Sequence, residues 1–135
     1  MSERTPVVTP EVEQRLASEE IIWFTTVNPR GVPTPNPVWF HWDGEIVVVY
    51  SQPQSYRVRN IWQNPHVALT LQGVDGLGNH VVIINGDATL HVDNKTIPAA
   101  YWEKYARLLQ DMSPAEMTAS YSVEIRVRPT RIRMG

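Results

Sequence analysis

The chain has 135 residues, of which 42% are apolar and 19% charged, a composition typical of one globular domain over residues 1–135 and not of a disordered chain. Its 12 basic residues are outnumbered by 14 acidic ones, so a nucleic-acid polymer is not an expected partner. The absence of cysteine excludes disulfides, thiolate metal sites, iron–sulfur clusters and cysteine nucleophiles.

No apolar run approaches the roughly 18 residues that a membrane-spanning helix needs. The first residues also lack the basic-then-apolar order of a signal peptide. We therefore expect a cytoplasmic protein that does not bind membranes.

Six strands are predicted along the chain. A helix is expected to begin at Thr9-Pro10-Glu11, because threonine caps helices, proline suits the first position and acid favours the positive end. β-Branched and aromatic runs bounded by turn residues then predict strands over residues 21–27, 32–42, 45–50, 66–72, 80–92 and 119–133. Asp43-Gly44 is a hairpin signal, so the first three strands are expected to form an antiparallel meander.

Two further helices and a helical turn are expected between the strands. Pro53 is placed at the first position of a short helix, and Asn94 to Gln110 is the clearest helical stretch, with one face formed by Ile97, Tyr101, Tyr105 and Leu108. Ser113 to Glu116 matches a capping box. Because hairpins join the strands and no βαβ alternation occurs, the predicted fold is mainly β, a small six-stranded antiparallel barrel with short flanking helices and a bulge near Gly86.

Prolines occupy every second position of the second strand, at Pro33, Pro35 and Pro37. Amides two residues apart point to the same edge of a strand, so all three missing donors lie along one edge and the strand can pair normally on one side only. One interpretation is protection of an exposed sheet edge against aggregation. The other is a backbone ridge that is free to meet a flat ligand, flanked by Trp39.

Strand alternation also predicts where Trp39 points. It lies on the face opposite the apolar set that is the better core candidate, namely Val38, Phe40 and Trp42. Trp39 is therefore expected to face outward, toward a ligand or a second subunit.

A second segment gathers hydroxyls, a helix start and two arginines between Ser51 and Asn60. These are the parts of an anion or phosphate site. Residues two apart on a helix diverge by about 200°, so Arg57 and Arg59 are not expected to converge, whereas Arg57 and Asn60 share a side. The alternative is a solvated surface helix.

Recognisable catalytic motifs are absent from the sequence. The four histidines have no metal-ligand spacing, and no metal site is expected. No glycine-rich phosphate loop and no GxSxG elbow occurs, so catalytic residues stay unassigned. Redox chemistry in such a chain would need a cofactor.

Several short motifs nevertheless occur in a specific order: TTVNPRGVP at 25–33, PVWFHWDG at 37–44, SQP at 51–53, RVRNI at 57–61, NPHVAL at 64–69 and GDA at 86–88. This order resembles the pyridoxamine 5'-phosphate oxidase-like split β-barrel superfamily. It is most similar to the actinobacterial branch that uses the deazaflavin coenzyme F420. The resemblance covers roughly residues 15–92.

The resemblance implies a homodimer with two cofactor sites at the subunit interface. It implies that the tricyclic ring lies along the strand that matches Pro37, Val38, Trp39 and Phe40. It also implies that the cofactor phosphate is held by the segment that matches Ser51, Gln52, Arg57, Arg59 and Asn60. The family often has lysine at the position of Arg57. Here a planar guanidinium, which can donate two parallel hydrogen bonds, replaces the ammonium group of lysine.

The activity implied is that of an F420-dependent oxidoreductase, which transfers a hydride between the reduced deazaflavin and a small conjugated or electron-poor substrate. Such a transfer needs the ring and the substrate in stacked contact and no nucleophile. Two alternatives remain open: an FMN-binding flavoprotein or flavin reductase of the same fold, and a non-catalytic carrier of deazaflavin, flavin or haem. Pyridoxamine phosphate oxidase activity itself is not expected, because the residues for that substrate's phosphate find no match.

Overall fold

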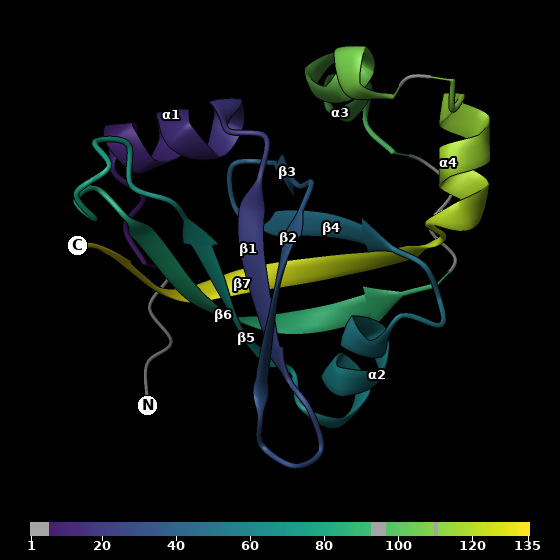
Figure 1. Cartoon of the computed structure of the whole chain (residues 1–135), viewed down its shortest axis with the longest axis horizontal. Helices are drawn as coiled ribbons and strands as arrows, with labels where there is room; N and C mark the ends of the chain where they lie inside the picture. Colours follow the sequence, from purple (N-terminus) through teal and green to yellow (C-terminus); the bar gives the residue numbers. More distant parts are fainter. Residues whose placement is uncertain (1–5, 93–96, 110) are drawn as a thin grey trace.

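The computed structural model describes residues 6–92, 97–109 and 111–135, and Figure 1 shows a strongly curled antiparallel sheet with α3 and α4 together at one side of it. The strands are β1 (Ile22–Val27), β2 (Pro33–Val38), β3 (His41–Trp42), β4 (Val47–Ser51), β5 (His66–Leu71), β6 (Val82–His91) and β7 (Val123–Met134). The helices are α1 (Pro10–Ser18), α2 (Tyr56–Gln63), α3 (Ala99–Tyr105), which continues into a 3₁₀ turn η1 (Ala106–Leu108), and α4 (Pro114–Ser120).

The order of strands explains how the sheet closes. It runs β2-β1-β5-β6-β7-β4-β3, and every pair of neighbours is antiparallel. Strands β2 and β3 therefore lie at opposite edges of the sheet, although only Trp39 and Phe40 separate them in the chain. The two edges meet at this point, and the sheet becomes a half-open barrel.

The predicted fold class, a mainly β split barrel, is confirmed, with seven strands in place of six. The extra strand arises because the expected strand 32–42 is divided at Trp39 and Phe40. The backbone N–H of Phe40 donates to the Tyr105 hydroxyl at 3.0 Å instead of to a neighbouring strand. The first half of the segment pairs with β1, and the second half forms the predicted hairpin with β4.

The barrel interior holds the main apolar cluster. It includes the predicted core set Val38, Phe40 and Trp42. Residues of α1 and α2, among them Leu16 and Ile61, pack against the same cluster. A second cluster joins the outer face of β4 to α3 through Val48, Tyr50, Ile97, Tyr101 and Tyr105, which confirms the predicted apolar face of that helix.

Three elements begin three or more residues later than predicted. Helix α2 begins at Tyr56, because Ser55 and not the residue before Pro53 is its N-cap. Helix α3 begins only at Ala99; part of the expected 94–110 helix, at 94–96 and 110, lies outside the described residues. The capping box at Ser113 is confirmed, but it starts a seven-residue helix, so the last strand begins at Val123.

The predicted bulge lies between β6 and β7. The register shifts at Asn85 and Gly86, since Gly86 faces Pro129 while Asn85 faces Arg131. A Cβ atom at Gly86 would lie 2.6 Å from Val127 Cγ1 and 2.7 Å from the carbonyl oxygen of Arg128. Only glycine allows the two strands to approach this closely.

We therefore expect Gly86→Ala to lower the free energy of unfolding by about 2–3 kcal/mol, the upper part of the range for overpacking. The change is measured by thermal or denaturant unfolding. Gly135→Ala is the control, because nothing lies within 4 Å of an added Cβ there. Equal stability of the two variants would mean that β6 and β7 can separate without cost.

Among the described residues, no helix has the length and apolar character needed to cross a membrane.

Candidate cofactor-binding site

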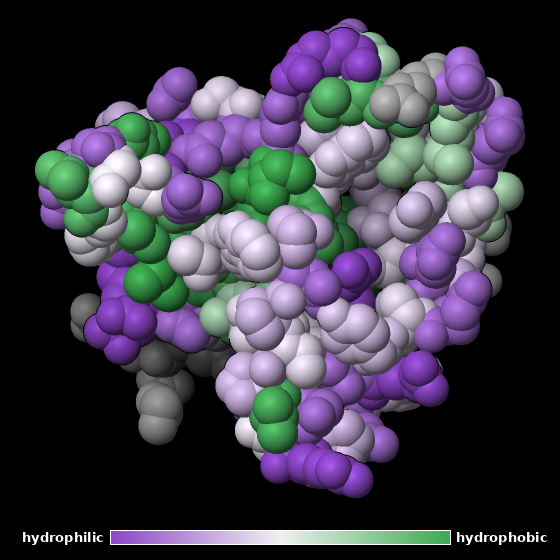
Figure 2. All heavy atoms as spheres, in the orientation of Figure 1, coloured by the Kyte–Doolittle hydropathy of each residue, from purple (hydrophilic) through white to green (hydrophobic). Residues whose placement is uncertain are grey.

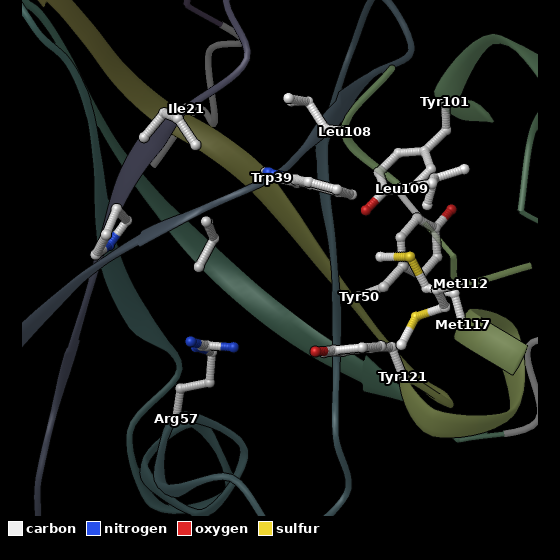
Figure 3. A pocket seen from close by; sticks show the side chains of 12 residues that line it. Ile21, Trp39, Tyr50, Arg57, Tyr101, Leu108, Leu109, Met112, Met117 and Tyr121 are labelled. Carbon is white, nitrogen blue, oxygen red and sulfur yellow. The ribbon is translucent and has the colours of Figure 1, made fainter. Parts of the chain in front are cut away.

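A cavity of about 480 Å³ lies between the sheet and the helical segment formed by residues 97–109 and 111–121. Figure 2 shows it as a hollow bordered by apolar side chains, and Figure 3 shows the residues around it. The sheet and α2 contribute Ile21, Pro37, Val38, Trp39, Tyr50 and Arg57; the helical segment contributes Tyr101, Leu108, Leu109, Met112, Met117 and Tyr121.

One wall of the cavity is the end of the proline-rich strand. Strand β2 pairs only with β1, so the predicted one-sided pairing is confirmed. Pro37, Val38 and Trp39 border the cavity where this strand ends. Pro37 has no backbone N–H, so it presents no donor on the unpaired side of the strand, beside this apolar space.

The indole of Trp39 faces away from the barrel core, as predicted. It stacks on the ring of Tyr105 with a centroid separation of 4.4 Å and an interplanar angle of 6°. The Tyr105 hydroxyl, in turn, lies 2.8 Å from the carbonyl oxygen of Glu20, to which it donates. Tyr105 on helix α3 therefore supports one face of the Trp39 indole. The position of Trp39 thus depends on a residue that is distant in the sequence.

The opposite end of the cavity is cationic. Arg57 on α2 donates from its guanidinium to the hydroxyl of Ser51 at 2.7 Å, and Ser51 is fully buried at the end of β4. Burial lowers the pKa of Arg57, and no carboxylate among the described residues forms an ion pair with it. A half-buried guanidinium with donors to spare is suited to a phosphate or carboxylate ligand.

Of the side chains that the structure describes around the cavity, Arg57 alone is charged. Burial raises the pKa of both Tyr50 and Tyr101, so these phenols stay protonated near neutral pH. The cavity thus combines one cation, neutral phenols and a large apolar surface.

The structure brings together only part of the sequence-predicted site. Pro37, Val38, Trp39 and Arg57 line the cavity, and Ser51 reaches it through its bond to Arg57. Phe40 lies in the barrel core, while Gln52 and Arg59 are exposed outside the lining.

Asn60 has a different place from the one that helical spacing predicts. It is buried beneath α2, where its amide donates to the hydroxyls of Thr26 at 2.9 Å and Thr34 at 3.2 Å. These bonds attach α2 to the β1–β2 pair. Asn60 therefore does not share the cavity with Arg57.

Sequence reasoning missed the half of the lining that comes from residues beyond 92. Tyr101 was expected as a buried helix residue, but nothing in the sequence indicates that Leu109, Met112 and Tyr121 face the same space. Among the described residues, no group of three or more histidine, aspartate or glutamate side chains is placed to hold a metal ion.

A curled antiparallel half-barrel with a few short helices is the architecture of the split-barrel class. The family model described as pyridoxamine 5'-phosphate oxidase matches residues 8–134, and the chain belongs to this family. The superfamily inferred from the ordered motifs is thus confirmed. No curated protein matches the chain.

Solved structures of the same fold differ in what their names describe. An F420 reductase is 27% identical with a TM-score of 0.71, covering 90% of this chain and 94% of that one. A conserved hypothetical protein from Mycobacterium tuberculosis is 22% identical with a TM-score of 0.75, covering 98% and 88%. The heme storage protein HutZ from Vibrio cholerae is 13% identical with a TM-score of 0.65, covering 94% of each chain. The last two are similar in fold alone.

Proposed function

We propose that the protein is an F420-dependent oxidoreductase that binds the deazaflavin coenzyme in the cavity between Trp39 and Arg57. The observation that carries this proposal is that the end of the proline-rich strand, Pro37 to Trp39, and the Arg57 guanidinium border the same space. Its volume of about 480 Å³ is within the usual range for small-molecule sites. The similarity to an F420 reductase at 27% identity supports the choice of cofactor.

The residues present fit such a cofactor. The strand end and the Trp39 indole offer a flat apolar surface for a planar ring, and Arg57, which Ser51 holds in place, offers charge-assisted bonds for a phosphate. Reduced F420 supplies a hydride when it is bound. The chain's own contribution is to orient ligands against Trp39 and to exclude water with the methionine and leucine side chains of the helical segment.

An FMN-binding flavoprotein is the second candidate. The cationic end at Arg57 would accept the phosphate of FMN by the same chemistry, so the cavity alone does not choose between the two cofactors. A non-catalytic carrier would use the same residues without turnover.

Fluorescence titration of the purified protein with F420 and with FMN, in separate experiments, tests the proposal. We expect submicromolar binding of F420, weaker binding of FMN, and oxidation of reduced F420 when a quinone or an enone is added. Tight binding of FMN alone would identify FMN, and not F420, as the cofactor of the protein. Binding of F420 without turnover on any conjugated acceptor would make the protein a carrier.

We also propose a homodimer. On β1, which pairs with the edge strand β2, Trp23 is 40% exposed, and Ile21 beside the cavity is 43% exposed. Large apolar groups beside an unpaired proline edge are typical of a surface that a second subunit covers. Light scattering at micromolar concentration should give twice the monomer mass; a monomer would count against a site at a subunit interface.

The wall residue Trp39 gives a sharper test. Trp39→Ala is expected to lower F420 affinity or turnover about tenfold or more, which corresponds to about 1.4 kcal/mol. Loss of the stack on Tyr105 should cost about 0.5–1.5 kcal/mol of stability, a shift of a few degrees in the thermal midpoint. Trp39→Phe retains a stacking ring and is the control. Unchanged cofactor affinity in a folded Trp39→Ala protein would remove Trp39 from the site.

A further inference from the structure

Tyr121 lies at the junction of α4 and β7. Its backbone N–H donates to the carbonyl oxygen of Met117 at 2.8 Å, which ends the helix, and its side chain is half-buried at the rim of the cavity. Figure 3 shows its hydroxyl directed across the cavity toward the guanidinium of Arg57. No feature of the sequence singles this tyrosine out.

The sheet register explains why the two side chains meet at one end of the cavity. Ser51, at the end of β4, pairs with Val123, at the start of β7. Tyr121 precedes Val123 by two residues, and Arg57 is attached to Ser51 by a hydrogen bond of 2.7 Å. Three elements, β4, α2 and the α4–β7 junction, therefore converge on the same place.

The chemistry of this end is that of a phosphate site with two sides. The guanidinium of Arg57 has N–H groups left after its bond to Ser51, and a phenol donates one hydrogen bond. Among the described residues, no carboxylate that would repel an anion lines the cavity. A phosphate between the two side chains would accept charge-assisted hydrogen bonds from the Arg57 guanidinium on α2. It would also accept a hydrogen bond from the Tyr121 hydroxyl on the opposite, helical wall.

We propose that Tyr121 and Arg57 form a two-sided phosphate clamp, in which the Tyr121 hydroxyl is a specificity-determining donor that selects phosphorylated flavins or deazaflavins over their phosphate-free forms. The inference rests on the proposed function, because it assigns the clamp to the phosphate of that cofactor. It also connects ligand binding to the helical segment, since Tyr121 is the one member of the clamp that the segment supplies.

Ligands that differ in the phosphate test the clamp. FMN is compared with riboflavin, and F420 with its deazaflavin chromophore lacking the phosphate-bearing tail. Tyr121→Phe keeps the ring and removes only the hydroxyl. We expect it to raise the dissociation constant of the phosphorylated member of each pair by about tenfold, the usual effect of losing one bond to a charged group, and to leave the phosphate-free member nearly unchanged.

Tyr101→Phe is the matched control, because Tyr101 lines the same cavity on the wall away from Arg57. It should not distinguish phosphorylated from phosphate-free ligands. Equal losses for both ligands in Tyr121→Phe would make Tyr121 a packing residue and overturn the clamp, as would an unchanged affinity for both.

Failure of the proposed function is distinguishable from failure of the clamp. If the wild-type protein binds neither F420 nor FMN, the proposed function fails. The clamp is then tested separately, by titrating the protein with inorganic phosphate and following the NMR signals of the arginine side chains. A saturable shift of the Arg57 signal that weakens in Tyr121→Phe supports the clamp. A shift that is absent, or equal in both proteins, overturns it.

Discussion

Replacing Arg57 with alanine is expected to raise the dissociation constant of F420 by about 10- to 150-fold, because a hydrogen bond to a charged group contributes about 1.5–3 kcal/mol. The side chain is half-buried at the cavity and bonds to the hydroxyl of Ser51. Removing that bond should cost about 1 kcal/mol of stability, too little to unfold the protein. Fluorescence titration of the folded variant measures the effect.

Arg59 provides the matched control on the same helix. It carries the same charge but is exposed and lies outside the cavity lining, so Arg59→Ala should leave the affinity for F420 nearly unchanged. Arg57→Lys keeps the charge and loses the fork, and we expect an intermediate loss. Equal effects of the two alanine variants would indicate a general electrostatic attraction of the cofactor and no specific phosphate-binding site at Arg57.

The largest effect on stability is expected for Arg15, which is 5% exposed. Its Nε donates to the carboxylate of Glu19 at 2.5 Å, its Nη2 donates to the carbonyl oxygen of Gln72 at 2.6 Å, and its Nη1 bonds to the carbonyl oxygen of His80. One side chain on α1 thus joins the end of β5 to the segment that enters β6.

Arg15→Ala would leave these acceptors without a partner. Because Glu19 is partly exposed, we expect a loss near the lower limit for breaking a buried pair, about 3 kcal/mol. For a chain of this size that corresponds to a fall of about 12 °C in the thermal midpoint. Arg30→Ala, in the exposed turn between β1 and β2, is the control. A midpoint within a few degrees of wild type would show that α1 is not needed to hold the β5–β6 connection.

Local patterns in the sequence were sufficient for most of the fold. The alternating segments became strands, Thr9 and Ser113 became helix caps, and the prolines at 33, 35 and 37 became the edge of the sheet. Each of these features depends on neighbours within a few residues. Alternation alone also placed Trp39 outside the core.

The misplaced features depend on contacts between distant parts of the chain. The break in the strand at Phe40 depends on Tyr105, 65 residues away, and the two carbonyl partners of Arg15 lie 57 and 65 residues away. Asn60 has the helical spacing expected of a cavity residue, yet its side-chain amide donates hydrogen bonds to two threonine hydroxyls on β1 and β2. No local propensity contains this information.

The same distinction applies to the candidate site. The residues that sequence placed in the cavity, Pro37 to Trp39 and Arg57, are within the stretch that carries the family motifs. The opposite wall comes from residues 101–109 and 112–121, where the sequence has helix caps and an apolar face but none of the family motifs. Its tyrosines and methionines face the cavity only because α3 and α4 pack beside the sheet.

A crystal structure of the protein with bound F420 would test the central claim most directly. The account predicts the phosphate in contact with the Arg57 guanidinium and the deazaflavin ring against Pro37, Val38 and Trp39. Electron density for the cofactor at any other surface, with this cavity filled by water or by a second subunit, would contradict it.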